Sequence, residues 1–311
     1  MKETDAIFAH LTAVHRRAAS SEDTLRLSCD AKAPVLIGPF SRGGKSRCGT
    51  QGVDHDFKPW GKLTPFGIFL PDQKELNFYF TSSKVTSDFI VDRLDQWWQA
   101  NRGRHPKVRK LLLDLDNGPE NHSRRSQFIY RLVRWAQATQ LTIELVYYPP
   151  YHSKYNPVER CWGVLEVYWN GDLLDSEDAV LKFAGNMTYA GKHPQVYRVS
   201  QPYNRGVRRS NAEKKILEGR LMRLATLPKW SVIIAPAEPG EVIPRLSLTP
   251  FALLLATEGL GLYAVDQLFS FTRLRSATTV RLSASIECLG NAVTVNVVRD
   301  FLRGIPCALR A

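Results

Sequence analysis

The sequence predicts an α/β fold in which helices cover a mixed β-sheet. Some short segments place apolar residues at every second position, and some longer ones place them at helical spacing. Their order supports the same class, because three strand-like segments are followed by helix, strand, helix, strand and helix. With 311 residues, 44% of them hydrophobic, the chain can also bury a sizeable core.

Five strands are predicted, and they differ in pattern. Residues 25–30 alternate apolar and polar side chains, and residues 76–81 place Leu, Phe and Phe on one face, as half-buried strands do. Residues 65–70, 110–116 and 143–148 are short, mostly apolar runs, which favour buried strands. The five segments together predict a five-stranded sheet.

Three helices are predicted between and after these strands. Residues 90–98, 129–136 and 158–169 each carry an apolar stripe at helical spacing. The tryptophans on these stripes are interpreted as core residues rather than as platforms for stacking bases.

The charge balance indicates a polyanionic partner. The chain has 42 basic and 30 acidic residues, a net charge of +12, and a calculated pI near 9.6. This favours nucleic acid over a membrane surface. No signal peptide is expected, and the longest apolar stretch, residues 251–269, contains Glu258 and Asp266, too much charge for a membrane span. The five cysteines form no CxxC pair, so we expect reduced thiols and a cytoplasmic location.

Composition changes sharply after Trp230. Residues 231–311 contain no Lys and no Trp and are close to neutral. We therefore expect a catalytic core over residues 1–236 and an unrelated C-terminal extension over residues 237–311 that is weakly integrated or not integrated with it.

Two acidic residues end predicted strands. Asp30 ends the first strand, and Asp116 ends the fourth, just before Asn-Gly. Desolvating an ionised carboxylate is costly, and a bound divalent cation would offset that cost. The alternative for Asp116 is that it caps the turn through its own backbone. Asp114 lies deeper in the same strand and is expected to pair with a base.

A third acid, Glu159, stands at a helix start. Asn156 and the following Pro are typical of the first positions of a helix, so Glu159 could simply complete a capping box. Against this, Gly163 lies one turn further on and leaves room for a ligand beside Glu159. Glu166, two turns on, is the fallback candidate.

Together, Asp30, Asp116 and Glu159 fit a site for two magnesium ions, with manganese as an alternative. Two carboxylates on adjacent strands and one on a following helix can hold paired metals that act on a phosphodiester.

The longest recognisable stretch is residues 110–171, which includes the runs LDLDNGPEN and YHSKYNPVERCWG. It closely resembles the Rhodopirellula-type DDE transposase family of bacterial insertion sequences, which is related to the mariner-like superfamily. Further similar segments are residues 37–47, 54–67, 86–98 and 227–230.

This resemblance implies an RNase H-like fold and metal-dependent cleavage and transfer of DNA strands. The acids of the family motif fall on Asp30, Asp116 and Glu159. Members of the family begin with a helix-turn-helix region that reads the element ends. Met1 lies just before the similar segment, so that region is expected to be absent, and DNA binding is expected to be weak and nearly independent of sequence.

Basic side chains near these motifs are candidate contacts to the DNA backbone. Residues 38–46 suggest a nucleotide-binding loop, but the spacing has one residue too many, so nucleotide hydrolysis is not expected. A solvated loop is the alternative for each group, and His152 could instead orient a water. The candidates are Arg42, Lys45, Arg47, His122, Arg124, Arg125, His152 and Lys154.

The expected partners are the DNA of element ends and of target sites. The protein is expected to form a homo-oligomer on this DNA and to lie in the cytoplasm, associated with the nucleoid. Two other functions stay open. One is an inactive transposase remnant that binds DNA weakly and without specificity, and the other is a general RNase H-like nuclease.

Overall fold

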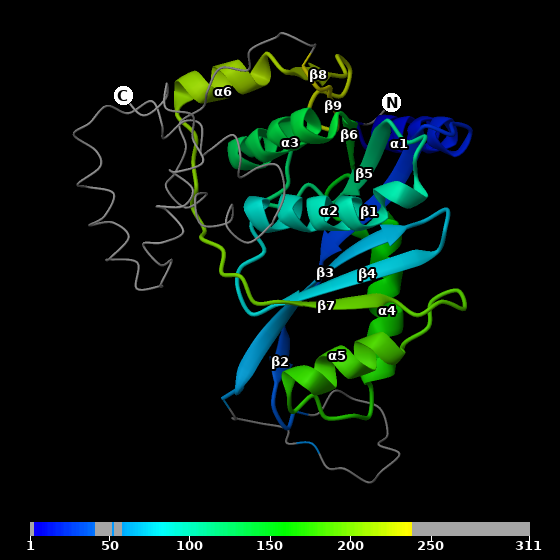
Figure 1. Cartoon of the computed structure of the whole chain (residues 1–311), viewed down its shortest axis with the longest axis vertical. Coiled ribbons are helices and arrows are strands. Elements are labelled where there is room, and N and C mark those ends of the chain that lie inside the picture. The colour runs from blue at the N-terminus through cyan, green and yellow to red at the C-terminus, as the bar shows by residue number, and fades with distance from the viewer. Residues whose placement is uncertain (1–2, 41–51, 53–57, 238–311) are drawn as a thin grey trace, which may run out of the picture. The chain divides into compact units, whose positions relative to one another are not determined.

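The computed structural model describes residues 3–40, 52 and 58–237. The helices are α1 (Glu3–Ala19), α2 (Ser87–Asn101), α3 (Ser126–Thr139), α4 (Pro157–Trp169), α5 (Glu177–Asn186) and α6 (Asn211–Glu218). The strands are β1 (Thr24–Ala31), β2 (Val35–Ile37), β3 (Gly61–Leu70), β4 (Glu75–Thr81), β5 (Lys110–Leu115), β6 (Thr142–Tyr147), β7 (Gln195–Val199), β8 (Leu221–Arg223) and β9 (Ser231–Ile234). Figure 1 shows their arrangement.

A mixed sheet forms the centre of the fold, in the order β7-β4-β3-β1-β5-β6-β9-β8, with β2 paired to β3. Strands β1, β3 and β4 form an antiparallel meander, and β5 and β6 are added parallel to β1 on its other side. An antiparallel meander followed by parallel strands that connect through helices is the RNase H-like arrangement. The expected α/β fold class is confirmed.

All five predicted strands are present, as β1, β3, β4, β5 and β6, but the number five is too small, because the described residues contain nine strands. Strands β2, β8 and β9 have only three or four residues, too few to show a period. Most of β7 is only partly buried at the sheet edge, so its apolar signal is weak. Strand β9 pairs with β6 even though it follows the change in composition at Trp230.

The two faces of the sheet carry different helices. Helices α1 and α4 both contact β1, and α4 also contacts β3. Helix α2 lies on the opposite face, where Phe89 packs edge-on against Phe66 of β3 at 5.6 Å between ring centroids. Helix α3 packs beside α2. The side chains of Ser28 and Asp30, which alternate with inward apolar residues on β1, therefore lie on the face of α1 and α4.

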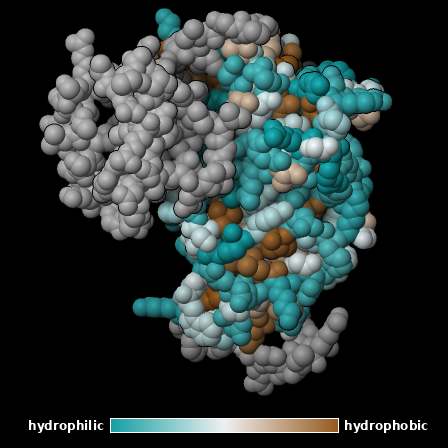
Figure 2. Space-filling model, in the orientation of Figure 1, coloured by the Kyte–Doolittle hydropathy of each residue, from teal (hydrophilic) through white to brown (hydrophobic). Residues whose placement is uncertain are grey.

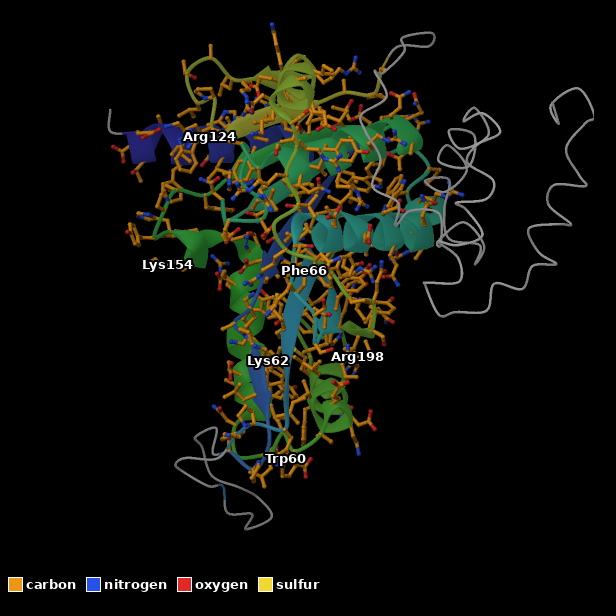
Figure 3. The ribbon with its side chains drawn as sticks, turned by 90° about the vertical axis from the view of Figure 1, so that its left-hand side faces the viewer. Trp60, Lys62, Phe66, Arg124, Lys154 and Arg198 are labelled. Carbon is orange, nitrogen blue, oxygen red and sulfur yellow. The ribbon has the colours of Figure 1, made fainter. Side chains whose placement is uncertain are left out.

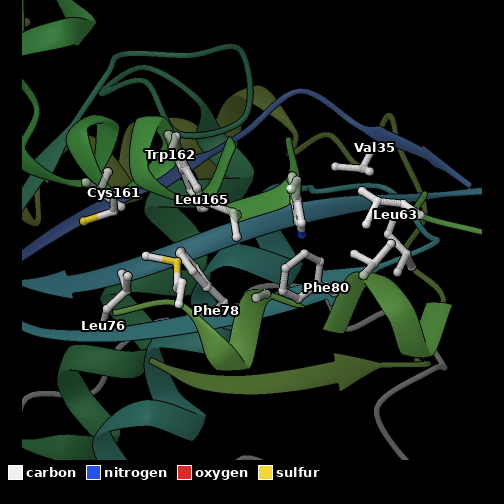
Figure 4. Close-up of a cluster of buried hydrophobic side chains, with 14 of the residues drawn as sticks. Val35, Leu63, Leu76, Phe78, Phe80, Cys161, Trp162 and Leu165 are labelled. Atoms are coloured by element: carbon white, nitrogen blue, oxygen red, sulfur yellow. The ribbon is translucent and has the colours of Figure 1, made fainter. Parts of the chain in front are cut away.

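A hydrophobic core fills the space between α4, α5 and strands β2 to β4 (Figure 4). Trp162 of α4 stacks on Phe78 of β4 with ring centroids 5.0 Å apart, and Phe80 packs against Trp169. The predicted core role of these tryptophans is confirmed, because Trp162 is 4% exposed and Trp169 is fully buried. The packing fixes the orientation of α4 on the sheet.

The outer surface of the described residues is mostly hydrophilic on the face seen in Figure 2. None of the helices in the described ranges is long and apolar enough to cross a membrane. Cys29 and Cys161 are buried free thiols. Residues 238–311 lie outside the described residues, so the division at residue 236 stays a prediction.

Candidate active site

The candidate site lies at one edge of the sheet, where β1 and β5 end. These strands are parallel neighbours, with Ser28 of β1 opposite Asp114 of β5. Asp30 stands near the end of β1, and Asp116 directly follows β5. The carboxyl ends of parallel strands meet at the same edge, so the two carboxylates come together there. Glu159 joins them from the first turn of α4.

The start of α4 is fastened to β1 by two fully buried polar residues. The Ser28 hydroxyl accepts a hydrogen bond from the backbone N–H of Val158 at 2.9 Å and donates to Oδ1 of Asn156. The Asn156 amide in turn donates to the carbonyl oxygen of Cys29 at 3.3 Å. Helix α4 is thus capped by a hydroxyl from the strand that carries Asp30.

This arrangement corrects one expectation about the helix start. Asn156 makes no side-chain hydrogen bond to its own helix. Its amide is used on β1 instead, because burial beside the strand gives it better partners than the N–H groups of the first turn. A complete capping box is present in α6, between Ser210 and Glu213.

Gly67 sets how closely α4 approaches the sheet. It is the β3 residue opposite Asp30. A Cβ atom at this position would lie 2.8 Å from Val158 and 2.9 Å from Trp162, closer than real Cβ contacts allow. A Cβ on Gly163 would meet nothing within 4 Å, so the room expected there does not depend on that glycine. The close approach that matters is at Gly67.

The three carboxylates interact electrostatically. Asp30 is 8% exposed, and its pKa is raised well above the ordinary value, first by burial and then by the charges of Asp116 and Glu159. A hydrogen bond with the Glu159 side chain raises it further. The structure therefore brings together the three acids singled out in the sequence, and Asp30 and Glu159 are in direct contact.

Asp116 is held by the turn that follows it. Its Oδ1 accepts hydrogen bonds from the Gly118 N–H at 3.1 Å and from the Asn121 amide at 2.7 Å. The Asn121 carbonyl oxygen accepts a hydrogen bond from the buried Tyr147 hydroxyl at 2.8 Å. The turn-capping alternative is thus correct for one carboxylate oxygen. Oδ2 has no hydrogen-bond partner among the described residues and is left for another ligand.

The two secondary acids lie apart from this group. Asp114 is fully buried and pairs with Arg26 at 2.6 Å and with Nε2 of His15 at 2.8 Å. This agrees with the expectation that Asp114 pairs with a basic side chain. Glu166 forms an ion pair with Lys32 at 2.7 Å.

The chemistry of the donors fits a divalent cation. Asp30, Asp116 and Glu159 supply hard oxygen ligands, and no Lys or Arg forms an ion pair with any of them within the described part of the chain. Across the same residues, however, no group of three or more His, Cys, Asp or Glu has the spacing of a ready-made metal cluster. The fit therefore rests on uncompensated carboxylates rather than on preformed coordination geometry.

A basic cavity of about 250 Å³ lies beside the turn after Asp116. It is lined by Asn117, His122, Ser123, Arg124 and Lys229. Arg124 and Lys229 are exposed, and neither has an ion-pair partner among the residues described. The pKa of His122 is lowered by partial burial and then by the charges of Arg124 and Arg125, while Glu120 opposes them. The two exposed cations therefore give the cavity lining its basic character.

Lys229 was not singled out from the sequence, because it lies 113 positions after Asp116 and no local pattern connects them. The LPKW segment that holds it is nonetheless among the segments that carry the family resemblance. Its carbonyl oxygen accepts a hydrogen bond from Ser123 at 2.8 Å, and this brings the two segments together.

The other basic candidates differ in whether their side chains already have partners within the protein. Arg125 forms an ion pair with Glu120 at 3.1 Å, so a neighbour in the same loop already compensates its charge. Lys154 is exposed and lies over the Tyr155 ring. The His152 ring donates a hydrogen bond from its Nδ1–H to the Pro150 carbonyl oxygen at 2.8 Å. Arg42, Lys45 and Arg47 lie outside the described residues.

A family model for the Rhodopirellula transposase DDE domain matches residues 1–236. The chain belongs to this family. Residues 1–236 therefore form a DDE transposase domain, as the motifs around Asp116 and Glu159 had indicated. None of the curated proteins matches the chain.

Two solved structures are similar to this DDE domain at low identity. One is a Mos1 transposase paired-end complex with the left transposon end, with a TM-score of 0.40 and 14% identity, covering 56% of this chain and 50% of that chain. The other is a Mos1 mariner paired-end complex with Mn, with a TM-score of 0.39 and 11% identity, covering 55% and 50%. The chain thus spans about half the length of these structures.

Proposed function

We propose that this DDE transposase domain cuts DNA at the ends of an insertion sequence and joins the freed ends to target DNA. The observation that carries the proposal is the meeting of Asp30, Asp116 and Glu159, from three elements, with no basic partner among the described residues. These three residues are the proposed catalytic residues and metal ligands. The reaction would take place on the nucleoid, with a homo-oligomer on the DNA.

The reaction consists of two phosphodiester exchanges. Water attacks the phosphorus at the element end, and the bond to the 3′ oxygen breaks to leave a 3′-hydroxyl. That hydroxyl then attacks a phosphodiester of the target, whose own 3′ oxygen leaves. Two divalent ions, Mg²⁺ or Mn²⁺, bound by the three carboxylates would activate the attacking oxygen and stabilise the leaving one.

The protein's own residues orient these carboxylates. Ser28 and Asn156 hold α4 so that Glu159 meets Asp30. Asn121 fixes one oxygen of Asp116 and leaves the other exposed to the site. Oriented ligands matter because small displacements of catalytic groups reduce rates strongly.

Cations beside the carboxylates would hold the DNA backbone. Arg124 and Lys229 line the basic cavity next to Asp116, and Lys154 lies in the loop before α4. In Figure 3, Arg124 and Lys154 lie on the same side of the ribbon. Lysine and arginine without a protein partner are suited to phosphate groups, and they make affinity depend on salt.

A cleavage assay with four single variants tests the proposal. The substrates are labelled duplexes with an element end or a scrambled sequence, with Mg²⁺, Mn²⁺ or EDTA. We expect Asp30→Asn, Asp116→Asn and Glu159→Gln each to lower cleavage by on the order of 10³-fold, since each removes a metal-binding charge. Glu166→Gln is the matched control on the same helix, and its activity should stay within about threefold of wild type.

Other outcomes point to the other functions. Binding without cleavage in any metal would indicate an inactive remnant. Equal cleavage of both duplexes without joining would indicate a general nuclease. Loss of activity in Glu166→Gln but not in Glu159→Gln would contradict the assignment of the third acid.

A further inference from the structure

Tyr151 combines full exposure with an unfavourable backbone conformation. Its side chain is 100% exposed, and its φ angle is +63°. Residues other than glycine seldom adopt this left-handed region, least of all with a bulky side chain. The ring gains no buried contact that would offset the strain. Strain at a position with no structural benefit points to a function.

The turn that carries Tyr151 is fastened on both sides. The His152 N–H donates to the Pro149 carbonyl at 3.1 Å, which closes a turn with Pro150 and Tyr151 at its centre. Proline followed by a left-handed residue is the pattern of a type II turn, in which glycine is favoured at the second central position. The His152 ring packs edge-on against Phe8 of α1 at 5.6 Å. The tyrosine ring is therefore presented to solvent from a fixed base.

This turn connects two parts of the candidate site. It begins where β6 ends, and there the Tyr148 N–H donates to the Leu115 carbonyl at 3.0 Å, one residue before Asp116. It continues through residues 153–155 into α4 and Glu159. Exposed Lys154 adds a positive charge three residues after Tyr151.

We propose that Tyr151 stacks on an unpaired base of the DNA strand that is cut at the site. The inference rests on the proposed function. The nearby Tyr155 ring is exposed only in part and is already packed against Phe8 and His152. The fully exposed Tyr151 ring, with an exposed lysine three residues on, suits one base next to a phosphate, whereas a protein partner needs a broader apolar patch. Bases within an intact duplex are already stacked on each other, so the free partner of the ring is a base that is unpaired near the cut.

Binding measurements with two DNAs test this inference. One duplex is fully paired, and the other has two unpaired nucleotides at its end, one of them 2-aminopurine. Affinity is measured in EDTA, so that cleavage does not interfere. Tyr151→Asn removes the ring and tolerates the left-handed backbone, Tyr151→Phe keeps the ring, and Trp60→Ala removes a 70% exposed ring at the far end of the ribbon in Figure 3.

We expect Tyr151→Asn to weaken binding of the unpaired DNA about tenfold and of the paired DNA less than twofold. Tyr151→Phe and Trp60→Ala should bind both DNAs as wild type does. Wild type and Tyr151→Phe should quench the 2-aminopurine fluorescence, whereas Tyr151→Asn should not. Because the turn is relieved of strain, the unfolding midpoint of Tyr151→Asn should be no lower than that of wild type.

Two results would overturn the inference. If Tyr151→Asn binds both DNAs as wild type does, or loses affinity equally for both, no base stacks on Tyr151, while the cleavage proposal stands. If wild type binds neither DNA, the proposed function fails, and the stacking fails with it.

Discussion

Asp30 of β1 and Asp114 of β5 are both buried acids on the same face of the sheet, and the fold surrounds them with different neighbours. Asp114 is fully buried, but Arg26 and His15 bind both of its oxygens. Asp30 is 8% exposed and has carboxylates for neighbours, so its pKa is raised. The difference teaches that burial of an acid alone does not indicate a function. Burial without a compensating cation does, because such a charge is kept at a cost to stability.

The same comparison separates structural from functional positions along each strand. Asp114 of β5 is a paired core acid, whereas Asp116, which directly follows the strand, has one unbound oxygen at the sheet edge. On β1, Arg26 neutralises the charge of Asp114, Ser28 caps α4, and Asp30 has carboxylates rather than a cation beside it. All three side chains of β1 lie on the same face, so the change follows the distance from the sheet edge.

The largest effect on stability is expected at Asp114, whose charge is compensated by Arg26. Asp114→Asn leaves Arg26 buried without its counter-charge, and we expect a loss of about 3–5 kcal/mol. For a domain of this size the unfolding midpoint should fall by roughly 10 °C. Glu22→Gln, which removes an exposed ion pair with Lys107, is the control and should change it by less than about 2 °C. Equal effects of the two variants would mean that Asp114 is not the compensated core acid described here.

A smaller loss is expected at the link between the strands and α4. Ser28→Ala removes the hydroxyl that caps the helix, at a cost of about 1–2 kcal/mol. Because Glu159 stands in that first turn, cleavage should fall about tenfold or more, beyond what the lower stability explains. Ser20→Ala, at the exposed end of α1, should leave both quantities unchanged. Thermal unfolding and cleavage rates at a temperature well below both midpoints measure the two effects separately.

Much of this fold could be predicted from periodicity. The five central strands and helices α2, α3 and α4 carry clear patterns because they are long and half-buried or fully buried. Helix α1 was not expected, although its buried residues Ile7, Leu11, Val14 and Ala18 recur at helical spacing. Strands β8 and β9 could not be predicted, since strands of three or four residues form only through their neighbours.

The candidate site was predictable in its acids but not in their support. Strand ends and the helix start indicated Asp30, Asp116 and Glu159. The pairing of Asn156 with β1, the close approach at Gly67 and the position of Lys229 depend on segments far apart in sequence. Such contacts follow from tertiary packing, and no local pattern carries them.

The third stability prediction concerns Asp30, which has no cation beside it. Here the informative result is whether Asp30→Asn raises or lowers the stability of the fold. Because the folded state raises the pKa of Asp30, folding favours its protonated form. This contribution to stability is present below the ordinary pKa of 3.8 and is lost as the pH rises through the folded value. Asp30→Asn removes the cost at neutral pH, so its advantage over wild type should be small near pH 4 and larger at pH 7.

The most direct measurement of the central claim is therefore the unfolding midpoint of wild type and Asp30→Asn at pH 7, without metal and with Mn²⁺. Without metal, the variant should unfold at a higher temperature than wild type, since the neutral amide avoids the cost of ionising a carboxyl whose pKa burial and its acidic neighbours raise. With Mn²⁺, wild type should gain stability and the variant little, so that the difference disappears or reverses. A variant that is less stable than wild type without metal, or an equal gain from Mn²⁺ in both proteins, would contradict the account.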